Sequence, residues 1–251
     1  MAESFHIRLA GQLIEIKPLY EGVKKLCRDY LSEETAADFS VVITPADIEA
    51  EREYAAESAL REGQPSSVHS DIYLETLAVY RKIADAMLER DILLFHGSAV
   101  VRDGEVYLFA ARSGTGKTTH SRLWLREFPD AYILNGDKPL LRIGSEGVSV
   151  CGTPWMGKEG YGCNEQLPLK AICILERGEE NKIERISFGE ALGALLTQSY
   201  VRKKGSMIDT ITLLAKVRNV AFYRLHCNME AEAAWVSYRG MQDVAGSRGA
   251  L

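Results

Sequence analysis

A glycine-rich loop between an apolar strand and a helix carries the residues in this sequence that are best suited to phosphate chemistry. Gly114, Gly116, Lys117 and Thr118 follow the apolar run from Val106 to Ala110. Glycines allow backbone N–H groups to surround a phosphate, and the following helix directs its positive end at the same group. A lysine here can bridge β- and γ-phosphates, while a threonine hydroxyl can ligate Mg²⁺. The pattern therefore predicts that ATP and Mg²⁺ bind at these residues: Ser113, Gly114, Thr115, Gly116, Lys117, Thr118 and Thr119.

The loop departs from the Walker A pattern at one position. That pattern requires glycine, four variable residues and then Gly-Lys-Ser or Gly-Lys-Thr, whereas this chain has Ala111 at the first position. A glycine-rich β-turn that happens to precede a helix is the alternative interpretation. The order of strand, two glycines, lysine, threonine and helix favours nucleotide binding, because each part is where the phosphate mechanism needs it.

A histidine upstream of the loop is a second candidate for chemistry. His96 and Gly97 follow the apolar strand expected at Ile92 to Phe95. If that strand pairs with the one that precedes the loop, His96 lies beside the phosphates, where it can orient a carboxylate or contact a phosphate. The alternative is a half-buried histidine at a strand end that is hydrogen-bonded to the backbone.

An aspartate downstream of the loop is the third candidate. Asp137 follows the apolar strand expected at Tyr132 to Leu134, which is the place of a Walker B acid that holds Mg²⁺ directly or through water. The alternative is an Asn-Gly-Asp turn that closes a hairpin, because Asn-Gly is a strong hairpin pattern. A phosphate loop needs an acid on a neighbouring strand, which favours a functional role for Asp137.

These motifs together resemble the HPr kinase/phosphorylase family, whose nucleotide-binding core is shared with ATP-dependent phosphoenolpyruvate carboxykinases. The resemblance covers roughly residues 70 to 180 and rests on four pieces in order: His96-Gly97, the loop Ser113 to Thr118, the acid after Ile133-Leu134, and Gly152 to Lys158. It implies an α/β fold with a P-loop kinase domain of that type, and transfer of the γ-phosphoryl group of ATP to a serine hydroxyl.

The chain differs from HPr kinases at the acid. Those enzymes have two adjacent aspartates, one as base and one as metal ligand, and here the pair is Gly136-Asp137. Asp137 then serves both purposes, or the base comes from elsewhere, or nucleotide binds without efficient transfer. The candidate catalytic residues are Asp137, His96, Lys117 and Lys158, the last in a loop from which it can contact a phosphate. The candidate metal ligands are Thr118 and Asp137.

The remaining sequence indicates an α/β fold with a small N-terminal module. Apolar and polar residues alternate on both sides of Ala10-Gly11, which predicts a β-hairpin. Turn residues between Gly63 and Ser70 suggest a linker. We therefore expect an N-terminal α/β module at residues 1–66 and a P-loop nucleotide-binding kinase domain at residues 67–251, which begins with an amphipathic helix at about 72–90.

Composition excludes several classes of partner. Lys and Arg total 30 against 35 Asp and Glu, a net charge of −5, so no overall positive field attracts nucleic acid. The five cysteines form no C-x-x-C pair, which argues against a zinc site or a disulfide framework. Apolar runs are far shorter than the roughly 20 residues of a membrane span, and the N-terminus has no signal-peptide pattern. We expect a cytoplasmic protein without a membrane partner.

The leading hypothesis is an ATP- and Mg²⁺-dependent kinase. Its acceptor would be a hydroxyl on a peptide, a protein or a small molecule, and homo-oligomerisation is left open. Two alternatives remain: a carboxykinase-like phosphotransferase that acts on a carbon acid, and a nucleotide-binding sensor in which Gly136 marks weakened catalysis.

Overall fold

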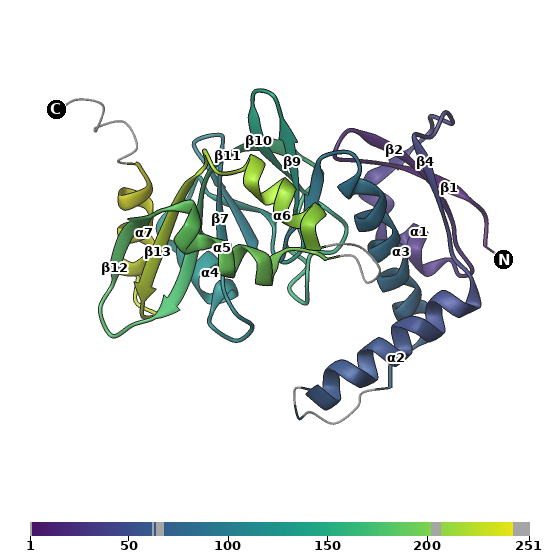
Figure 1. Cartoon of the computed structure of the whole chain (residues 1–251), viewed down its shortest axis with the longest axis horizontal. Helices are drawn as coiled ribbons and strands as arrows, with labels where there is room; N and C mark the ends of the chain where they lie inside the picture. Colours follow the sequence, from purple (N-terminus) through teal and green to yellow (C-terminus); the bar gives the residue numbers. More distant parts are fainter. Residues whose placement is uncertain (1, 62, 64–67, 202–206, 243–251) are drawn as a thin grey trace. The chain divides into compact units, whose positions relative to one another are not determined.

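A computed structural model describes residues 2–61, 63, 68–201 and 207–242 (Figure 1). The chain forms two compact units, Met1–Glu89 and Arg90–Leu251. The expected boundary after residue 66 falls on residues outside the described ones. The division instead follows the helix at Asp71–Leu88, because this helix packs against the helices and a strand of the first unit. Among the described residues, no helix is long and apolar enough to cross a membrane.

The first unit is a four-stranded sheet covered by helices. Its strands lie in the order β3-β1-β2-β4. Ala10 and Gly11 both have positive φ (51° and 78°), which suits a tight turn between β1 and β2 and confirms the predicted hairpin. The predicted amphipathic helix is also confirmed, as α3. The elements are β1 (Phe5–Leu9), β2 (Gln12–Lys17), α1 (Gly22–Leu26), a 3₁₀ turn (Arg28–Tyr30), β3 (Leu31–Ser32), β4 (Phe39–Val42), α2 (Pro45–Arg61) and α3 (Asp71–Leu88).

The second unit is built on a nine-stranded mixed sheet of the described residues. Its main path is β5-β9-β10-β11-β7-β6-β8, with β13 beside β11 and β12 beside β13. The strands β7, β11 and β13 are parallel neighbours at its centre. The strands are β5 (Ile92–Leu94), β6 (Ser98–Arg102), β7 (Glu105–Ala110), β8 (Tyr132–Asn135), β9 (Leu140–Gly144), β10 (Gly147–Cys151), β11 (Gln166–Arg177), β12 (Lys182–Ile186) and β13 (Ala221–Cys227).

Helices cover this sheet because its central strands are apolar on both faces. Tyr107 and Phe109 of β7 point into a core shared with Trp124 and with alanines 233 and 234 of the last helix. On β13, Phe222 contacts the ring of Phe188 with centroids 5.8 Å apart. The helices are α4 (Lys117–Glu127), α5 (Phe188–Gln198), α6 (Met207–Lys216) and α7 (Glu232–Gln242). The α/β class predicted from the sequence is confirmed.

The position of β6 determines which chain segments meet at one edge of the sheet. β6 lies between β7 and β8 and is antiparallel to both, so β7 and β8 run in the same direction. Their carboxyl ends, which lead into Ala111 and Asp137, therefore meet at the same edge, where β6 begins. The sequence left open whether the strand before His96 pairs with β7, and it does not, because β5 pairs with β9. His96 nevertheless reaches this edge because it directly precedes β6.

Replacement of Trp124 by alanine should destabilise the second unit by about 3 to 5 kcal/mol, because a fully buried indole among four aromatic rings would leave a cavity. Urea denaturation measures the change in the free energy of unfolding. Met207→Ala, which truncates a side chain that is 55% exposed, is the control and should be nearly neutral. A loss below about 1 kcal/mol for Trp124→Ala would contradict this packing.

Candidate functional site

The glycine loop, residues 111–116, connects the end of β7 to the start of α4. Gly114 and Gly116 have φ of 76° and 123°, values that L-residues rarely adopt. A Cβ on Gly114 would meet no atom within 4 Å, so the backbone conformation rather than space requires glycine there. The predicted order of strand, glycine loop and helix is thus confirmed, whereas phosphate binding by the loop stays a prediction.

Three hydrogen bonds fix the shape of the glycine loop. The Lys117 ammonium donates to the carbonyl of Ala111 at 2.9 Å, and Arg177 Nη2 donates to the carbonyl of Gly114 at 2.7 Å. The N–H of Thr115 donates to the carbonyl of Arg112 at 3.1 Å. The turn thus uses the Thr115 N–H itself, so this amide does not face a phosphate in this conformation.

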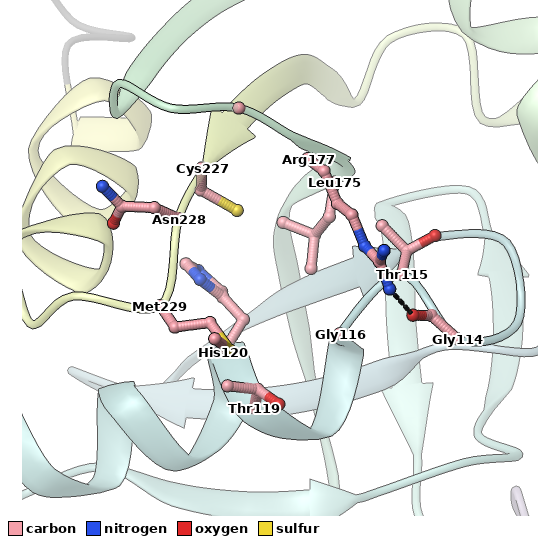
Figure 2. Close-up of a pocket in the computed structure, with 11 residues that line it drawn as sticks. Gly114, Thr115, Gly116, Thr119, His120, Leu175, Arg177, Cys227, Asn228 and Met229 are labelled. Carbon is pink, nitrogen blue, oxygen red and sulfur yellow. Dashed lines mark hydrogen bonds between the residues drawn. The ribbon is translucent and has the colours of Figure 1, made fainter.

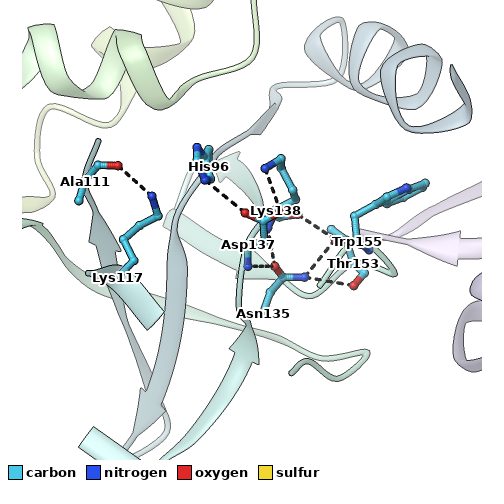
Figure 3. A network of polar contacts seen from close by, with 8 residues as sticks. All are labelled: His96, Ala111, Lys117, Asn135, Asp137, Lys138, Thr153 and Trp155. Carbon is cyan, nitrogen blue, oxygen red and sulfur yellow. Dashed lines mark hydrogen bonds and ion pairs between the residues drawn. The ribbon is translucent and has the colours of Figure 1, made fainter. Parts of the chain in front are cut away.

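The carboxylate of Asp137 lies between the side chains of His96 and Lys138 (Figure 3). His96 Nε2 is 3.2 Å from Oδ1, and Lys138 Nζ is 2.9 Å from Oδ2. Burial would raise the pKa of Asp137, but the hydrogen bond from His96 and the ion pair with Lys138 together lower it to about 2. The carboxylate is therefore ionised at neutral pH, and the structure brings the predicted residues His96 and Asp137 into contact.

Lys117 lies near enough to this carboxylate to interact with it electrostatically. Burial lowers the pKa of Lys117, and the negative charge of Asp137 opposes that effect while Lys138 adds to it. The half-buried lysine, the carboxylate and the glycine loop thus form one polar cluster at the edge where β7 and β8 end (Figure 3). Sequence reasoning proposed these residues separately, and the topology of β6 explains why they are together.

Asn135 fixes the backbone around Asp137 and was missed by sequence reasoning. Its Oδ1 accepts from the N–H groups of Asp137 and Lys138 at 2.9 and 2.6 Å. Its amide nitrogen donates to Thr153, at 3.1 Å to the carbonyl and 3.0 Å to Oγ1. The side chain is fully buried. The alternative of an Asn-Gly-Asp turn that closes a hairpin is wrong, because β8 pairs with β6 whereas β9 pairs with β5 and β10. Asn135 instead holds the bend that carries Asp137.

The loop from Gly152 to Gly162 closes over Gly136. The Gly136 N–H donates to the carbonyl of Tyr161 at 3.0 Å. A Cβ on Gly136 would lie 3.1 Å from the Met156 carbonyl oxygen and 3.4 Å from that of Tyr161. These are backbone atoms, so they cannot turn away as a side chain can. Gly136 thus has little room for a side chain.

Lys158 lies on the same loop and is exposed. Its neighbour Glu159 pairs with Arg122 of α4, which connects this loop to the helix that follows the glycine loop. Across the described parts of the chain, no hydrogen bond or ion pair of the Lys158 ammonium group is seen. The structure therefore does not bring Lys158 into the polar cluster, and its catalytic role stays a prediction.

Gln198, the last residue of α5, links His96 to the glycine loop. It is buried, and its amide faces three acceptors: His96 Nδ1 at 3.1 Å, and the carbonyls of His96 and Ala111, each at 3.2 Å. Because all three atoms can accept, the amide nitrogen is the atom that faces them. Nδ1 of His96 is then an acceptor, so the ring proton is on Nε2 and is donated to Asp137. The sequence marked Gln198 only as a residue at a helix end.

A cavity of about 450 Å³ adjoins the glycine loop (Figure 2). Backbone of the loop forms one wall, Thr119 and His120 of α4 form a second, and the ends of β11 and β13 form the rest. Leu175 and Met229 make part of its surface apolar. The glycine loop therefore contributes both to the polar cluster at Asp137 and to the wall of this cavity.

The candidate metal ligands suit Mg²⁺ that is bound together with a phosphate. Mg²⁺ usually takes one or two protein oxygens and completes its shell with water and substrate phosphates. Asp137 retains further lone pairs, and Thr118 is exposed in the first turn of α4. In the described residues no group of three or more His, Cys, Asp or Glu is placed to hold a metal ion alone. A Mg²⁺ coordination shell that includes phosphate oxygens does not require such a group of residues.

Comparison with known proteins gives little further information. No protein-family model matches the chain, and no curated protein matches its sequence. Among solved structures, the chain is similar to the HPr(Ser) kinase/phosphatase from Coxiella burnetii, with 11% sequence identity and a TM-score of 0.33 over 60% of this chain and 94% of that one. A similarity of this extent does not establish a shared fold, so function must be inferred from the geometry of the chain itself.

Asp137→Asn should reduce stability in a pH-dependent way. The folded pKa of about 2 lies below the unfolded value of about 3.9, so the ionised carboxylate stabilises the fold above pH 4 and loses that effect as pH falls towards 2. The difference in free energy of unfolding between wild type and variant should therefore shrink over this range. Denaturant titrations at pH 6, 4, 3 and 2.5 measure it, and an unchanged difference at every pH would show that the carboxylate is not held as described.

Proposed function

We propose that this chain is an ATP- and Mg²⁺-dependent kinase that transfers the γ-phosphoryl group to a hydroxyl of a peptide, a protein or a small molecule. The observation that supports this most is the convergence of the glycine loop, Lys117 and Asp137 at one edge of the sheet. Phosphoryl transfer is catalysed mainly by positioning and by cations near the transferred group. A glycine loop at a helix N-terminus, a lysine and an acid that can ligate a metal are the parts that such catalysis requires.

Each residue of the cluster has a defined task under this proposal. The amides of the glycine loop and of the first turn of α4 bind the phosphates, assisted by the positive end of that helix. Lys117 leaves the Ala111 carbonyl and bridges the β- and γ-phosphates. Thr118 and Asp137 would hold Mg²⁺, which neutralises developing charge on the phosphate oxygens. His96, fixed by Gln198, orients Asp137.

The low pKa of Asp137 limits what this residue can do as a base. General bases work best when their pKa lies near the working pH, and Asp137 lies far below it. In a loose transition state the attacking hydroxyl needs little deprotonation, so orientation and charge supply most of the rate. We therefore assign Asp137 to metal binding and to orientation of the acceptor hydroxyl rather than to strong proton abstraction.

Transfer can be tested with γ-labelled ATP and Mg²⁺ against a panel of free serine, free threonine, serine-containing peptides and water. Wild-type protein should label at least one acceptor. Lys117→Ala and Asp137→Asn should each lower the rate by more than about 100-fold. The first removes a positive charge beside the transferred group, and the second removes a carboxylate that would bind Mg²⁺. Lys158→Ala tests whether Lys158, the remaining candidate catalytic residue, contributes to the transfer rate.

Asp130→Asn serves as a matched control, since Asp130 is an exposed carboxylate that pairs with Arg102 away from the cluster. Its rate should equal that of wild type. Near-normal transfer by Asp137→Asn would remove this residue from the site. Absence of Mg-ATP binding by wild-type protein would overturn the proposal as a whole.

A nucleotide-binding sensor is the second candidate, and the closure over Gly136 favours it. The second carboxylate of an aspartate pair has no room, and Lys138 already neutralises the first. Such a protein would bind Mg-ATP without transfer to any acceptor or to water. Nothing in the described residues favours the carboxykinase-like alternative.

Gly136→Asp should not restore an aspartate pair. The new side chain would press on the carbonyls of Met156 and Tyr161, so thermal stability should fall and the transfer rate should not rise. Gly144→Asp is the matched control, because a Cβ there meets its nearest atom at an ordinary 3.6 Å. Equal melting temperatures for the two variants would show that the loop leaves space at Gly136.

A further inference from the structure

One buried polar atom in the wall of the 450 Å³ cavity has no hydrogen-bond partner. This atom is Nδ1 of His120, a residue of α4 that is 2% exposed. Among the described residues that line this cavity, no other buried side-chain atom lacks a partner. Buried polar atoms in native proteins are nearly always paired, so an unpaired one beside a cavity is a candidate hydrogen-bond partner for a molecule bound there.

The other edge of the imidazole determines which nitrogen carries the proton. Ser237 Oγ donates its only hydrogen to the Ala234 carbonyl at 2.9 Å. The Trp124 indole N–H lies 2.8 Å from Ser237 Oγ and 3.2 Å from His120 Nε2, and we assign the nearer serine oxygen as its acceptor. Ser237 then has a lone pair to offer to His120 at 3.2 Å, and Nε2 donates to it. With its hydrogen on Nε2, the ring leaves Nδ1 as an acceptor that has no partner.

The cavity has the size and surroundings of a small-molecule subsite. Its volume of about 450 Å³ lies within the usual range of roughly 300 to 1,000 Å³ for ligand pockets. Residues 114–116 of the glycine loop form one wall of the cavity. Leu175 and Met229 offer apolar surface to a flat ring. Figure 2 shows the imidazole rising from α4 towards the end of β13, with the side chain of Met229 beside it.

We propose that this cavity takes the nucleoside part of the triphosphate and that His120 Nδ1 accepts a hydrogen bond from an N–H or O–H donor of that nucleoside. The inference rests on the proposed function and adds a specificity-determining residue to it. Nδ1 is screened from solvent when the cavity is empty. Met229, which is 77% exposed and unbranched, is the side chain that can turn aside to admit the ligand.

Two substitutions of His120 test the roles of its two ring nitrogens one at a time. In His120→Asn the amide occupies the position of Nδ1 and keeps an acceptor there. In His120→Gln the amide occupies the position of Nε2, so the pairing with Ser237 is kept and the cavity loses its acceptor. Calorimetric titration with Mg²⁺ and a non-hydrolysable ATP analogue should give near wild-type affinity for His120→Asn. Affinity should be about tenfold weaker for His120→Gln.

Inorganic tripolyphosphate with Mg²⁺ is the control ligand, because it can bind the glycine loop but has no nucleoside to occupy the cavity. Its affinity should be equal in wild type and both variants, with circular dichroism spectra and melting temperatures confirming that the variants are folded. Equal affinity of His120→Gln and wild type for the ATP analogue would overturn the inference. So would an ATP analogue that binds wild type no more tightly than tripolyphosphate. If neither ligand binds wild type, the proposed function itself fails.

Nucleotide analogues then identify the donor. Purine riboside triphosphate lacks the 6-amino group of ATP, whereas 2′-deoxy-ATP and 3′-deoxy-ATP each lack one ribose hydroxyl. The analogue that lacks the donor should bind wild type about tenfold more weakly than ATP and should be insensitive to His120→Gln. If all three analogues bind as tightly as ATP, no nucleoside donor pairs with His120 and the inference is wrong.

Discussion

The antiparallel pairing of β6 with both β7 and β8 is the constraint on which the site depends. It makes β7 and β8 parallel, so the glycine loop and Asp137 leave the sheet at the same edge. It also places His96 and Gly97 between them. Gly97 is needed there because a Cβ would lie 2.9 Å from the Phe109 carbonyl oxygen. A single strand thus brings together three segments that are far apart in the sequence.

Polar contacts from outside these strands complete the arrangement. Gln198 of α5 contacts both His96 and Ala111, Asn135 fixes the turn that carries Asp137, and Thr153 fixes Asn135 in turn. These side chains are buried, and an unpaired polar group at any of them would cost free energy. His96 and Asp137 are therefore held in one geometry before any ligand binds. Such preorganisation is what catalysis by positioning requires.

Local patterns made much of this predictable, and long-range packing explains what they missed. The glycine loop, the hairpin at Ala10-Gly11 and most central strands follow from turn chemistry and alternation, which depend on neighbours in sequence. The partner of β5, the domain division after α3, and the roles of Asn135, Gln198 and His120 depend on contacts between distant segments. β12 was missed because its polar sequence, KIERI, forms a strand only by pairing with β13.

Binding of a triphosphate tail by the backbone of residues 113–118 is the central claim. Amide chemical-shift mapping by NMR during titration with Mg-tripolyphosphate tests it most directly. The claim predicts saturable shifts concentrated at the amides of Gly114, Gly116, Lys117 and Thr118, with little change in the first unit. Shifts that are absent, or that are spread over surface lysines without saturation, would contradict it.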